Sequence, residues 1–433
     1  MTTVQIIGNP DTDYILLLPA YNKYKYIDFR IGEGVEDVIC DRNSLGTAIQ
    51  TRGNDSFSYS KPRITDFGLL VEESRSNLFI DNDFSTWISG STTVNESIVS
   101  PSRYLDATMV TENTASSIHG LLKSVSVTSG TSYTFSVFAK KGTRDVVQLH
   151  VPATGGGATC YANFDLTNGV KGTVGGGCTA TMDNVGYGWY RLSITFTAAA
   201  TTTASFSYLH VTATTSAANL THVGTSLTSY VWGASLEAGA FRTGFIAPNT
   251  TRGTELVTLA PSITLPAAFT LYVEATFNQT LAQTQTLLDL NDTTTSNNIV
   301  VTRTSSGVIT VIVKNAGATV VTKTFNSYTG ALNVKVGISF TGTAWIIGVN
   351  SDTTTATASL PAGMVNVALG SGYDRANPVN CFIQKFAILG TAFDVDSLKI
   401  LTNNEIPVEL VFYLLKEDGG FLLAEDGGKI ILD

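Results

Sequence analysis

Alternating apolar and polar residues recur in short runs along most of the chain. SYTFSVFAKKG, VVQLHV, YANFDL and WYRLSITFTA are rich in Tyr, Phe, Val, Ile and Thr, and turn-forming residues bound each run. Segments of this composition with a period of two predict β-strands that have one buried face. We therefore predict an all-β chain, built from tandem β-sandwiches because of its length.

One segment near the C-terminus departs from this pattern. Val395, Leu398 and Leu401 recur every three residues within FDVDSLKILTNNE, residues 393–405. This spacing predicts a short helix in a chain that is otherwise made of strands.

Composition divides the chain into four parts. Residues 1–67 carry more charge and tyrosine, residues 68–250 are rich in Thr, Ser, Gly and Ala, residues 251–405 are rich in Thr, Val and Ile, and residues 406–433 form a tail. We expect one β-sandwich in each of the two long blocks. A small N-terminal segment, which we expect to anchor the chain, then precedes them.

The tail contains an internal repeat with a period of eight residues. YLLKEDGG, residues 413–420, is followed directly by FLLAEDGG, residues 421–428. Asp-Gly supplies the positive φ angles of a tight turn, so the repeat predicts a C-terminal β-hairpin. A single hairpin is marginally stable in water, and its apolar side chains need a partner domain or another copy of the chain.

The charge content points to burial against other chains and away from nucleic acid. Hydrophobic residues make up 43% of the chain and charged residues 14%, whereas about 25% charged is typical of soluble domains. The net charge is −9, and no run of Lys and Arg offers contacts to phosphate backbones. The apolar runs are shorter than the ~20 residues of a membrane span. We expect no nucleic-acid binding, no membrane insertion, no signal peptide, and assembly in the cytoplasm.

The histidines and cysteines show no spacing typical of metal ligands. His119, His150, His210 and His222 lie in or beside apolar strands, which is typical of structural histidines. The cysteines lack a CxxC pattern, so we expect no zinc site and no disulfide framework. Buried free thiols are the expectation for the four cysteines, Cys40, Cys160, Cys178 and Cys381.

Five motifs in the first block resemble a module of tailed-bacteriophage virion proteins. They follow one another in the order and spacing of that module: KPRITDFGLLVEESRSNLFIDNDFSTW (61–87), YTFSVFAKKGTR (133–144), YANFDLTNGV (161–170), GYGWYRLSITFTA (186–198) and YVWGASLEAGAFRTGFI (230–246). The module resembles the head-spike or head-fibre domain, a jelly-roll of carbohydrate-binding-module type that also occurs in tail fibres. The resemblance covers roughly residues 60–255. Ser76 and Phe245 replace the more usual Thr and Tyr.

The second block resembles concanavalin-like or laminin-G-like sandwiches in its rhythm of strands. FTLYVEATFN, LLDLND, VKVGISFTGTAWIIGVN and FIQKFAILGTAFDVDSLKIL follow that order and end in a short helix. Both resemblances imply domains that bind carbohydrate or decorate a particle. Residues 1–60 resemble no family.

Catalytic sites find little support in the sequence. WGASLEAG contains Ser235 without the G-x-S-x-G pattern of a nucleophile elbow, and no His lies near it. Glycoside hydrolysis needs two carboxylates that flank a cleft. Adjacent Glu72 and Glu73 point to opposite faces of a strand, and nothing pairs the other candidates, Glu237, Asp289 and Asp292. We expect no enzyme, although a polysaccharide-depolymerising spike stays an alternative.

Sugar binding is the better-supported alternative, because sandwiches present aromatic rings that stack on pyranose rings. The four tryptophans are Trp87, Trp189, Trp232 and Trp345, and the alternation around the last three places them in the core. Tyr187 in NVGYGW and Tyr373 in GSGYDRAN lie in loops. We expect these two tyrosines to contact a ligand.

Calcium has one candidate site, in the segment LLDLNDTTTSNN. Its oxygen-bearing side chains are of the kind that Ca²⁺ binds, although Asp and Asn are also ordinary turn residues. We therefore expect no cofactor and keep calcium as an alternative at these residues, Asp289, Asn291, Asp292, Asn297 and Asn298.

Charged residues gather in the motifs that carry the phage resemblance. We expect them at one edge of the jelly-roll, where Glu/Arg pairs fix the linkers or a neighbouring chain. This expectation requires residues 68–73 and 230–238 to be adjacent in a sheet. The residues concerned are Arg63, Glu72, Glu73, Arg75, Glu237 and Arg242, and Arg252 lies nearby in sequence.

The resemblance of the first block implies a structural protein of a tailed phage. We expect a homotrimeric head or tail fibre in the virion, bound to capsid or tail proteins and attached weakly and multivalently to glycan on the host surface. A capsid decoration protein without any ligand is the alternative.

Overall fold

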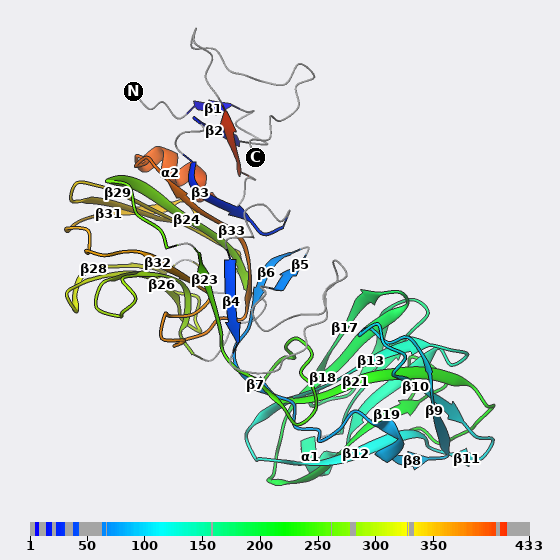
Figure 1. Cartoon of the computed structure of the whole chain (residues 1–433). Helices are drawn as coiled ribbons and strands as arrows, with labels where there is room; N and C mark the ends of the chain where they lie inside the picture. The colour runs from blue at the N-terminus through cyan, green and yellow to red at the C-terminus, as the bar shows by residue number, and fades with distance from the viewer. Residues whose placement is uncertain are drawn as a thin grey trace, which may run out of the picture. The chain divides into compact units, whose positions relative to one another are not determined.

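The computed structural model describes most of the chain as two compact units. The first sandwich comprises residues 74–253, and the second comprises the described residues up to 42, residues 63–73, and those from 254 onward. The residues described are 5–7, 14–19, 23–30, 38–42, 63–65, 67–156, 159–260, 262–277, 283–326, 328, 333–403 and 408–413. Antiparallel sheets dominate both units (Figure 1), which confirms the all-β prediction.

Two six-stranded sheets face each other in the first sandwich. The front sheet has the order β17 (Cys178–Gly186), β18 (Trp189–Thr197), β13 (Ser132–Lys141), β21 (Thr228–Ala238), β10 (Ala107–Glu112), β9 (Thr92–Ile98). The back sheet has the order β16 (Val170–Val174), β15 (Cys160–Asp165), β14 (Val146–Val151), β19 (Thr202–His210), β12 (His119–Val127), β8 (Ile88–Gly90). Successive strands β12, β13 and β14 cross between the sheets, as in a jelly-roll.

Short elements complete the first sandwich. Strand β11 pairs with β20, and β7 pairs with β22. Their bounds, with those of a short helix and a 3-10 turn, are β11 (Ser116–Ser117), β20 (His222–Val223), β7 (Arg75–Ser76), β22 (Thr251–Arg252), α1 (Ala153–Gly156) and η3 (Phe84–Thr86).

The front sheet of the first sandwich buries both of its faces. Its inner face packs against the back sheet through residues such as Phe135 and Leu192. Its outer face carries a separate apolar cluster formed by Phe138, Trp189 and Trp232, on which Phe245 from the segment after β21 also packs. Continuous burial along β13 and β21 follows from this arrangement, because side chains on both faces of these strands leave water.

Two larger sheets form the second sandwich. One has the order β28 (Ala318–Phe325), β27 (Ile309–Asn315), β26 (Asn298–Arg303), β25 (Gln285–Asn291), β32 (Asn366–Leu369), β23 (Glu255–Leu259), β4 (Val38–Arg42). The other has the order β31 (Asp352–Thr357), β30 (Ala344–Val349), β29 (Asn333–Thr341), β24 (Ala268–Phe277), β33 (Cys381–Leu389), β6 (Gly68–Val71), β5 (Arg63–Thr65), and β3 (Lys23–Asp28) also pairs with β33. A small sheet contains β1 (Gln5–Ile7), β2 (Tyr14–Pro19) and β34 (Val408–Tyr413).

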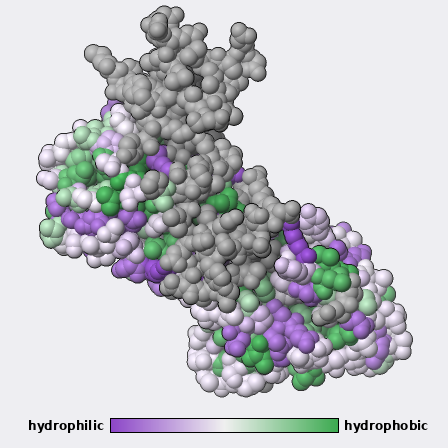
Figure 2. Space-filling view, viewed as in Figure 1, coloured by the Kyte–Doolittle hydropathy of each residue, from purple (hydrophilic) through white to green (hydrophobic). Residues whose placement is uncertain are grey.

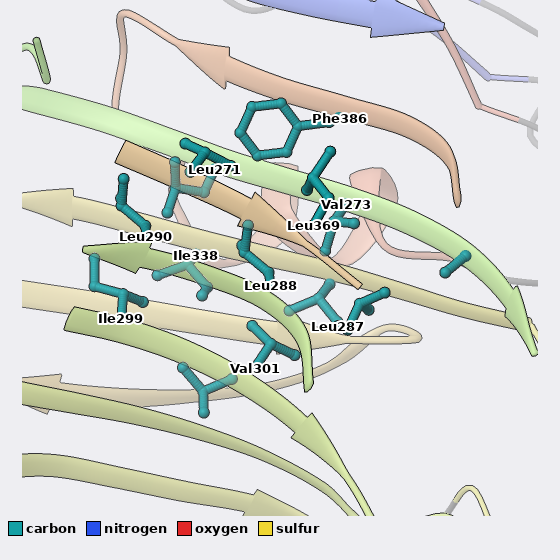
Figure 3. Packing of buried hydrophobic residues seen from close by; sticks show 14 of the residues in the cluster. Leu271, Val273, Leu287, Leu288, Leu290, Ile299, Val301, Ile338, Leu369 and Phe386 are labelled. Atoms are coloured by element: carbon teal, nitrogen blue, oxygen red, sulfur yellow. The ribbon is translucent and has the colours of Figure 1, made fainter. Parts of the chain in front are cut away.

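Branched aliphatic side chains fill the core between these two sheets. Leu271, Val273 and Phe386 from one sheet meet Leu288 and Ile299 from the other (Figure 3). At roughly 25 cal/mol per Å² of apolar surface, each such side chain contributes about 1.5–3 kcal/mol when fully buried. The alternation recognised in the sequence is the pattern that builds this core.

The predicted helix and the predicted core tryptophans are confirmed. Helix α2 (Val395–Leu401) begins at Asp394, whose side chain accepts a hydrogen bond from the Ser397 N–H as an N-cap does. Trp189, Trp232 and Trp345 are all buried. In the part of the chain that is described, no helix is long and apolar enough to cross a membrane.

The predicted boundaries differ from the observed units. Residues 1–67 were expected to form a separate segment, yet strands β3, β4 and β5 lie in the sheets of the second sandwich. Strand β6 was assigned to the module 68–250, and it also belongs to the second sandwich. The observed first sandwich therefore begins near residue 74.

The predicted pairing of residues 68–73 with residues 230–238 is wrong. Strand β6 pairs with β33 and β5, whereas β21 pairs with β13 and β10. Alternation shows which residues form a strand and which face is buried, but it does not identify the neighbouring strand. Asn77 and Leu78, just beyond the predicted stretch, hydrogen-bond to β21. The Leu78 N–H donates to Leu236 O at 2.8 Å, and Asn77 Nδ2 donates to Ala234 O at 3.0 Å.

Two sequence predictions concern residues or side chains that lie outside the described part of the chain. The hairpin repeat occupies residues 413–428, of which all but the first lie outside the described residues. The side chain of Cys40 also lies outside them. Among the cysteines that are described, Cys160 and Cys381 are buried free thiols and Cys178 is a half-buried one.

Candidate functional site

Tyr187 lies at the tip of the β17–β18 turn and is the most exposed large apolar residue of the described part, at 92%. Its φ is +52°, and the flanking Gly186 and Gly188 also have positive φ, at +88° and +78°. An aromatic residue in this left-handed region stores about 1–2 kcal/mol of strain. Asn184 Oδ1 fixes the turn by accepting the Gly186 N–H at 2.8 Å.

Three register partners lie beside this turn on the outer face of the front sheet. Trp189 of β18 is opposite Lys140 of β13, which in turn is opposite Tyr230 of β21. Register partners project from the same face of a sheet, and Trp189 belongs to the outer apolar cluster. We call Tyr187, Lys140 and Tyr230 the Tyr187 face.

Lys140 runs directly beneath the turn. A Cβ atom placed on Gly188 would lie 3.4 Å from Lys140 Cε and 3.9 Å from Nζ. Glycine at position 188 permits the positive φ angle of the turn, and the lysine side chain lies within ordinary van der Waals range of that position. The Tyr187 face combines aromatic rings with an ammonium, which together can stack on a sugar ring and bind its hydroxyls.

The segment after β21 covers part of the outer face through Phe245. It is held by Glu237 of β21, one of the predicted interface residues. Glu237 is fully buried and accepts hydrogen bonds from the N–H and the hydroxyl of Thr243, the latter at 2.5 Å. Arg191 lies 3.8 Å from Glu237 and donates to the Thr243 carbonyl at 2.6 Å. These contacts hold the covering segment in place beside the Tyr187 face.

Two more predicted interface residues belong to the same covering segment or contact it. Arg242 pairs with Asp183 of β17. The Arg75 guanidinium lies 5.0 Å from the centre of the Phe241 ring and against Gly239, where a Cβ atom would collide with it. Glu237, Arg242 and Arg75 are therefore brought together in the first sandwich.

The remaining predicted interface residues lie in the second sandwich. Arg63 is buried between Glu72, with which it forms an ion pair, and Glu255, whose Oε2 lies 2.6 Å from Nη2. Burial disfavours the charged guanidinium, but the two carboxylates outweigh this effect and raise the pKa of Arg63. Glu73 is half-buried. The sequence had singled out Arg63 and Glu72, but not Glu255.

Tyr373, the second tyrosine expected to contact a ligand, is half-buried. Its backbone N–H donates to Asp289 Oδ2 at 2.9 Å. Burial raises the pKa of the Asp289 carboxyl. The Tyr373 backbone therefore has a structural role, which distinguishes it from Tyr187.

The candidate calcium residues are largely engaged as turn residues. Asp292 accepts hydrogen bonds from the Thr294 N–H at 2.9 Å and from Asn297 Nδ2 at 2.8 Å. Asn291 Oδ1 accepts the Thr293 N–H at 2.9 Å. No group of three or more His, Cys, Asp or Glu side chains that could hold a metal occurs within the described ranges. These contacts are those of the alternative given above, in which Asp and Asn side chains hydrogen-bond to the backbone of their own turn.

A buried polar network between the two sheets of the first sandwich was missed by the sequence. Glu112 accepts two hydrogen bonds from Arg144 Nη2, at 2.6 and 2.7 Å, and lies 3.3 Å from His210 Nδ1. Burial alone would raise the pKa of Glu112, but the bonds from His210 and Arg144 hold it well below its usual range. The histidines had been read one at a time, and only the tertiary fold brings His210 and His222 to one carboxylate.

In this network Ser229 contacts His210, which in turn contacts Glu112. Ser229 Oγ lies 2.7 Å from His210 Nε2 and 2.7 Å from the Tyr208 hydroxyl. Burial lowers the pKa of His210, so the ring is neutral at pH 7 and has one donor and one acceptor nitrogen. Ser229, His210 and Tyr208 are all fully buried, so no substrate reaches the hydroxyl and the arrangement stabilises the sandwich.

Comparisons with known proteins find likenesses among solved structures. No protein-family model and no curated protein matches the chain. Among solved structures, the carbohydrate-binding module CBM40 of a Ruminococcus gnavus sialidase bound to α2,3-sialyllactose is 15% identical, with a TM-score of 0.29, and the match covers 32% of this chain and 84% of that one. A leech intramolecular trans-sialidase is 17% identical, with a TM-score of 0.29, and covers 34% of this chain and 25% of that one.

A third likeness is to a structure of botulinum neurotoxin type C, a protein whose cell entry depends on interaction with two ganglioside molecules. It is 12% identical, with a TM-score of 0.28, and the match covers 38% of this chain and 44% of that one. At these TM-scores and identities the likenesses carry no argument about ligands. The Tyr187 face has to be judged on its own geometry.

Proposed function

We propose that this chain is a structural protein of a tailed-phage particle that projects from the head or tail and attaches to host-surface glycan through the Tyr187 face. The five motifs of the first sandwich support the phage assignment by resemblance. The exposed aromatic ring beside an ammonium supports the glycan assignment by its chemistry.

The backbone strain at Tyr187 is the observation that carries the proposal. An exposed aromatic ring contributes nothing to the core, and its positive φ lowers stability. A residue that is strained and exposed at the same time suits a role outside the fold. Stacking on a sugar ring is the role that fits a tyrosine whose ring faces solvent.

The surface composition suits an assembly of several copies. Figure 2 shows weakly polar, white-coloured side chains over much of the visible described surface. With only 14% charged residues in the chain, such a surface favours contact with other copies, and we propose a homotrimer. Three weak sites on one particle component raise the effective concentration of glycan for one another.

A glycan array probed with the multimeric full chain tests the attachment role. We expect binding by the wild type and a loss of at least tenfold in apparent affinity for Tyr187→Ala. Tyr104→Ala is the matched control, because Tyr104 is also an exposed tyrosine, at 69%, but lies in the β9–β10 loop. Absence of binding by the wild type would leave the decoration role, and equal binding by both variants would reject the Tyr187 face.

Labelling of phage particles with an antibody against this chain tests the particle assignment. We expect the label on a projecting head or tail structure. A chain that is absent from purified particles would overturn the assignment independently of the glycan result.

A further inference from the structure

We infer that the Tyr187 face prefers anionic sugars, namely sugars that bear a carboxylate, sulfate or phosphate group, and that Lys140 provides this preference. The inference rests on the proposed attachment role and specifies the chemistry of its ligand. It is carried by the position of Lys140 and by the pairing of the other charges on the outer face of the front sheet.

The carboxylates of this face already have cationic partners. Asp183 pairs with Arg242, and Glu237 is bound by Thr243 with Arg191 3.8 Å away. Each of the two carboxylates, Asp183 and Glu237, therefore has one arginine close to it. Neither carboxylate is therefore available to neutralise a third cation.

Lys140 is that third cation. Among the side chains that the structure describes, no carboxylate lies within ion-pair distance of its ammonium. Lys140 is half-buried, and its register partners on either side are Trp189 and Tyr230. A lysine held between aromatic residues has fewer water molecules around its stem, and its charge is less screened than that of a fully exposed lysine.

The ammonium lies close to where a stacked sugar would be. Lys140 Nζ is 3.9 Å from the position that a Gly188 Cβ would occupy, one residue from Tyr187. A pyranose ring on Tyr187 would present its substituents toward this ammonium, which donates up to three hydrogen bonds and accepts none. An anionic substituent gains a charge-assisted hydrogen bond there, whereas a hydroxyl gains only a neutral acceptor contact.

The neighbouring lysine provides a matched control on the same strand. Lys141 follows Lys140 in β13, so its side chain leaves the opposite face. Its ammonium donates to Thr167 Oγ1 at 2.7 Å. Removal of the charge at position 141 changes the net charge of the protein as much as removal at position 140.

The experiment compares the full-length wild type with Lys140→Gln, Lys140→Arg, Lys141→Gln and Tyr187→Ala on an array of matched oligosaccharides. Each set contains a uronic-acid oligosaccharide, the same compound with its carboxylates reduced to alcohols, and a sulfated neutral counterpart. For the wild type we expect at least fivefold tighter binding of the anionic members. Lys140→Gln removes this ratio, whereas Lys140→Arg and Lys141→Gln keep it.

The outcomes separate the inference from the proposed function. Equal affinity of the wild type for neutral and anionic oligosaccharides overturns the anionic preference. If Tyr187→Ala then binds none of these oligosaccharides, glycan attachment through the Tyr187 face still stands. An anionic preference that persists in Lys140→Gln also overturns the assignment to Lys140. Failure of the wild type to bind any member overturns both.

Discussion

Tyr187 and Tyr373 have similar local sequences but different roles in the two sandwiches. Both follow a glycine in a short polar loop, in NVGYGW and GSGYDRAN. Tyr187 projects from a turn whose backbone is strained, whereas Tyr373 is half-buried and its N–H satisfies Asp289. A loop tyrosine becomes available for a ligand when the surrounding chain places no structural demand on it.

The two sandwiches also differ in how they neutralise buried charge. The second sandwich places two carboxylates on one cation, Arg63, while the first gives one carboxylate, Glu112, several donors. Loss of the cation therefore removes the ion-pair partner of two buried carboxylates in the second sandwich and of one carboxylate, Glu112, in the first.

The largest expected effect is that of Arg63→Met, which should destabilise the second sandwich by about 4 kcal/mol, because removal of one partner of a buried ion pair costs about 3–5 kcal/mol. Arg144→Met should cost the first sandwich about 2 kcal/mol, because the Glu112 carboxylate keeps the Thr225 N–H and His210. Hydrogen exchange of the full chain, read from peptides of each sandwich, measures both values. An equal loss in the two variants contradicts this difference.

A fall in pH should lower the stability of the first sandwich and raise that of the second. Burial lowers the pKa of His150 in the first sandwich to about 4, so between pH 6.5 and 4 the unfolded chain binds a proton that the folded chain does not. The first sandwich should lose at most about 3 kcal/mol from this histidine as the pH falls through that window. His150→Gln should remove this part of the pH dependence.

The second sandwich contains none of the four histidines, because all of them lie between residues 119 and 222. Burial raises the pKa of Asp289. The folded state therefore retains a proton above the pH at which the unfolded state releases it, and the associated stability is lost as the pH rises. Hydrogen exchange at pH 7 and pH 5 should show the first sandwich weakened relative to the second, and equal responses would contradict this expectation.

Replacement of Tyr187 should show that its backbone strain lowers the stability of the first sandwich. Tyr187→Gly removes the strained aromatic residue and should raise the stability of the first sandwich by about 1 kcal/mol, measured by the denaturant midpoint. Tyr373→Ala should leave glycan binding unchanged. A stability loss for Tyr187→Gly would indicate that the ring packs in the fold, contrary to its exposure.

The smallest expected effect concerns the candidate calcium residues. Asp292→Ala removes three hydrogen bonds of an exposed turn and should cost about 1 kcal/mol. Thermal unfolding in calcium and in a chelator checks this account. A rise in Tm with calcium that Asp292→Ala abolishes would show a metal site in place of a turn.

Local pattern allowed the strands, helix α2 and the buried tryptophans to be predicted, because alternation and helical spacing report which face of an element is buried. The partner of each strand could not be predicted in this way. Strand β6 shows the limit, since GLLV is a strand in any environment and only the fold places it beside β33. The phage resemblance of the surrounding motif had suggested the wrong sandwich.

The candidate site also has one residue that local sequence identifies and others that depend on the fold. Exposure of Tyr187 follows from its position between two glycines, so the sequence could identify it. Its neighbours Lys140 and Tyr230 lie on other strands and are opposite one another only through the register of β13 with β21. The Glu112 network joins residues up to 113 positions apart, and no local spacing announces it.

A crystal structure of the full chain with the tightest-binding array glycan tests the central claim most directly. We predict a sugar ring stacked on Tyr187, with an anionic substituent hydrogen-bonded to Lys140 Nζ. A sugar bound at Tyr373, or at a surface away from the β17–β18 turn, would contradict the claim.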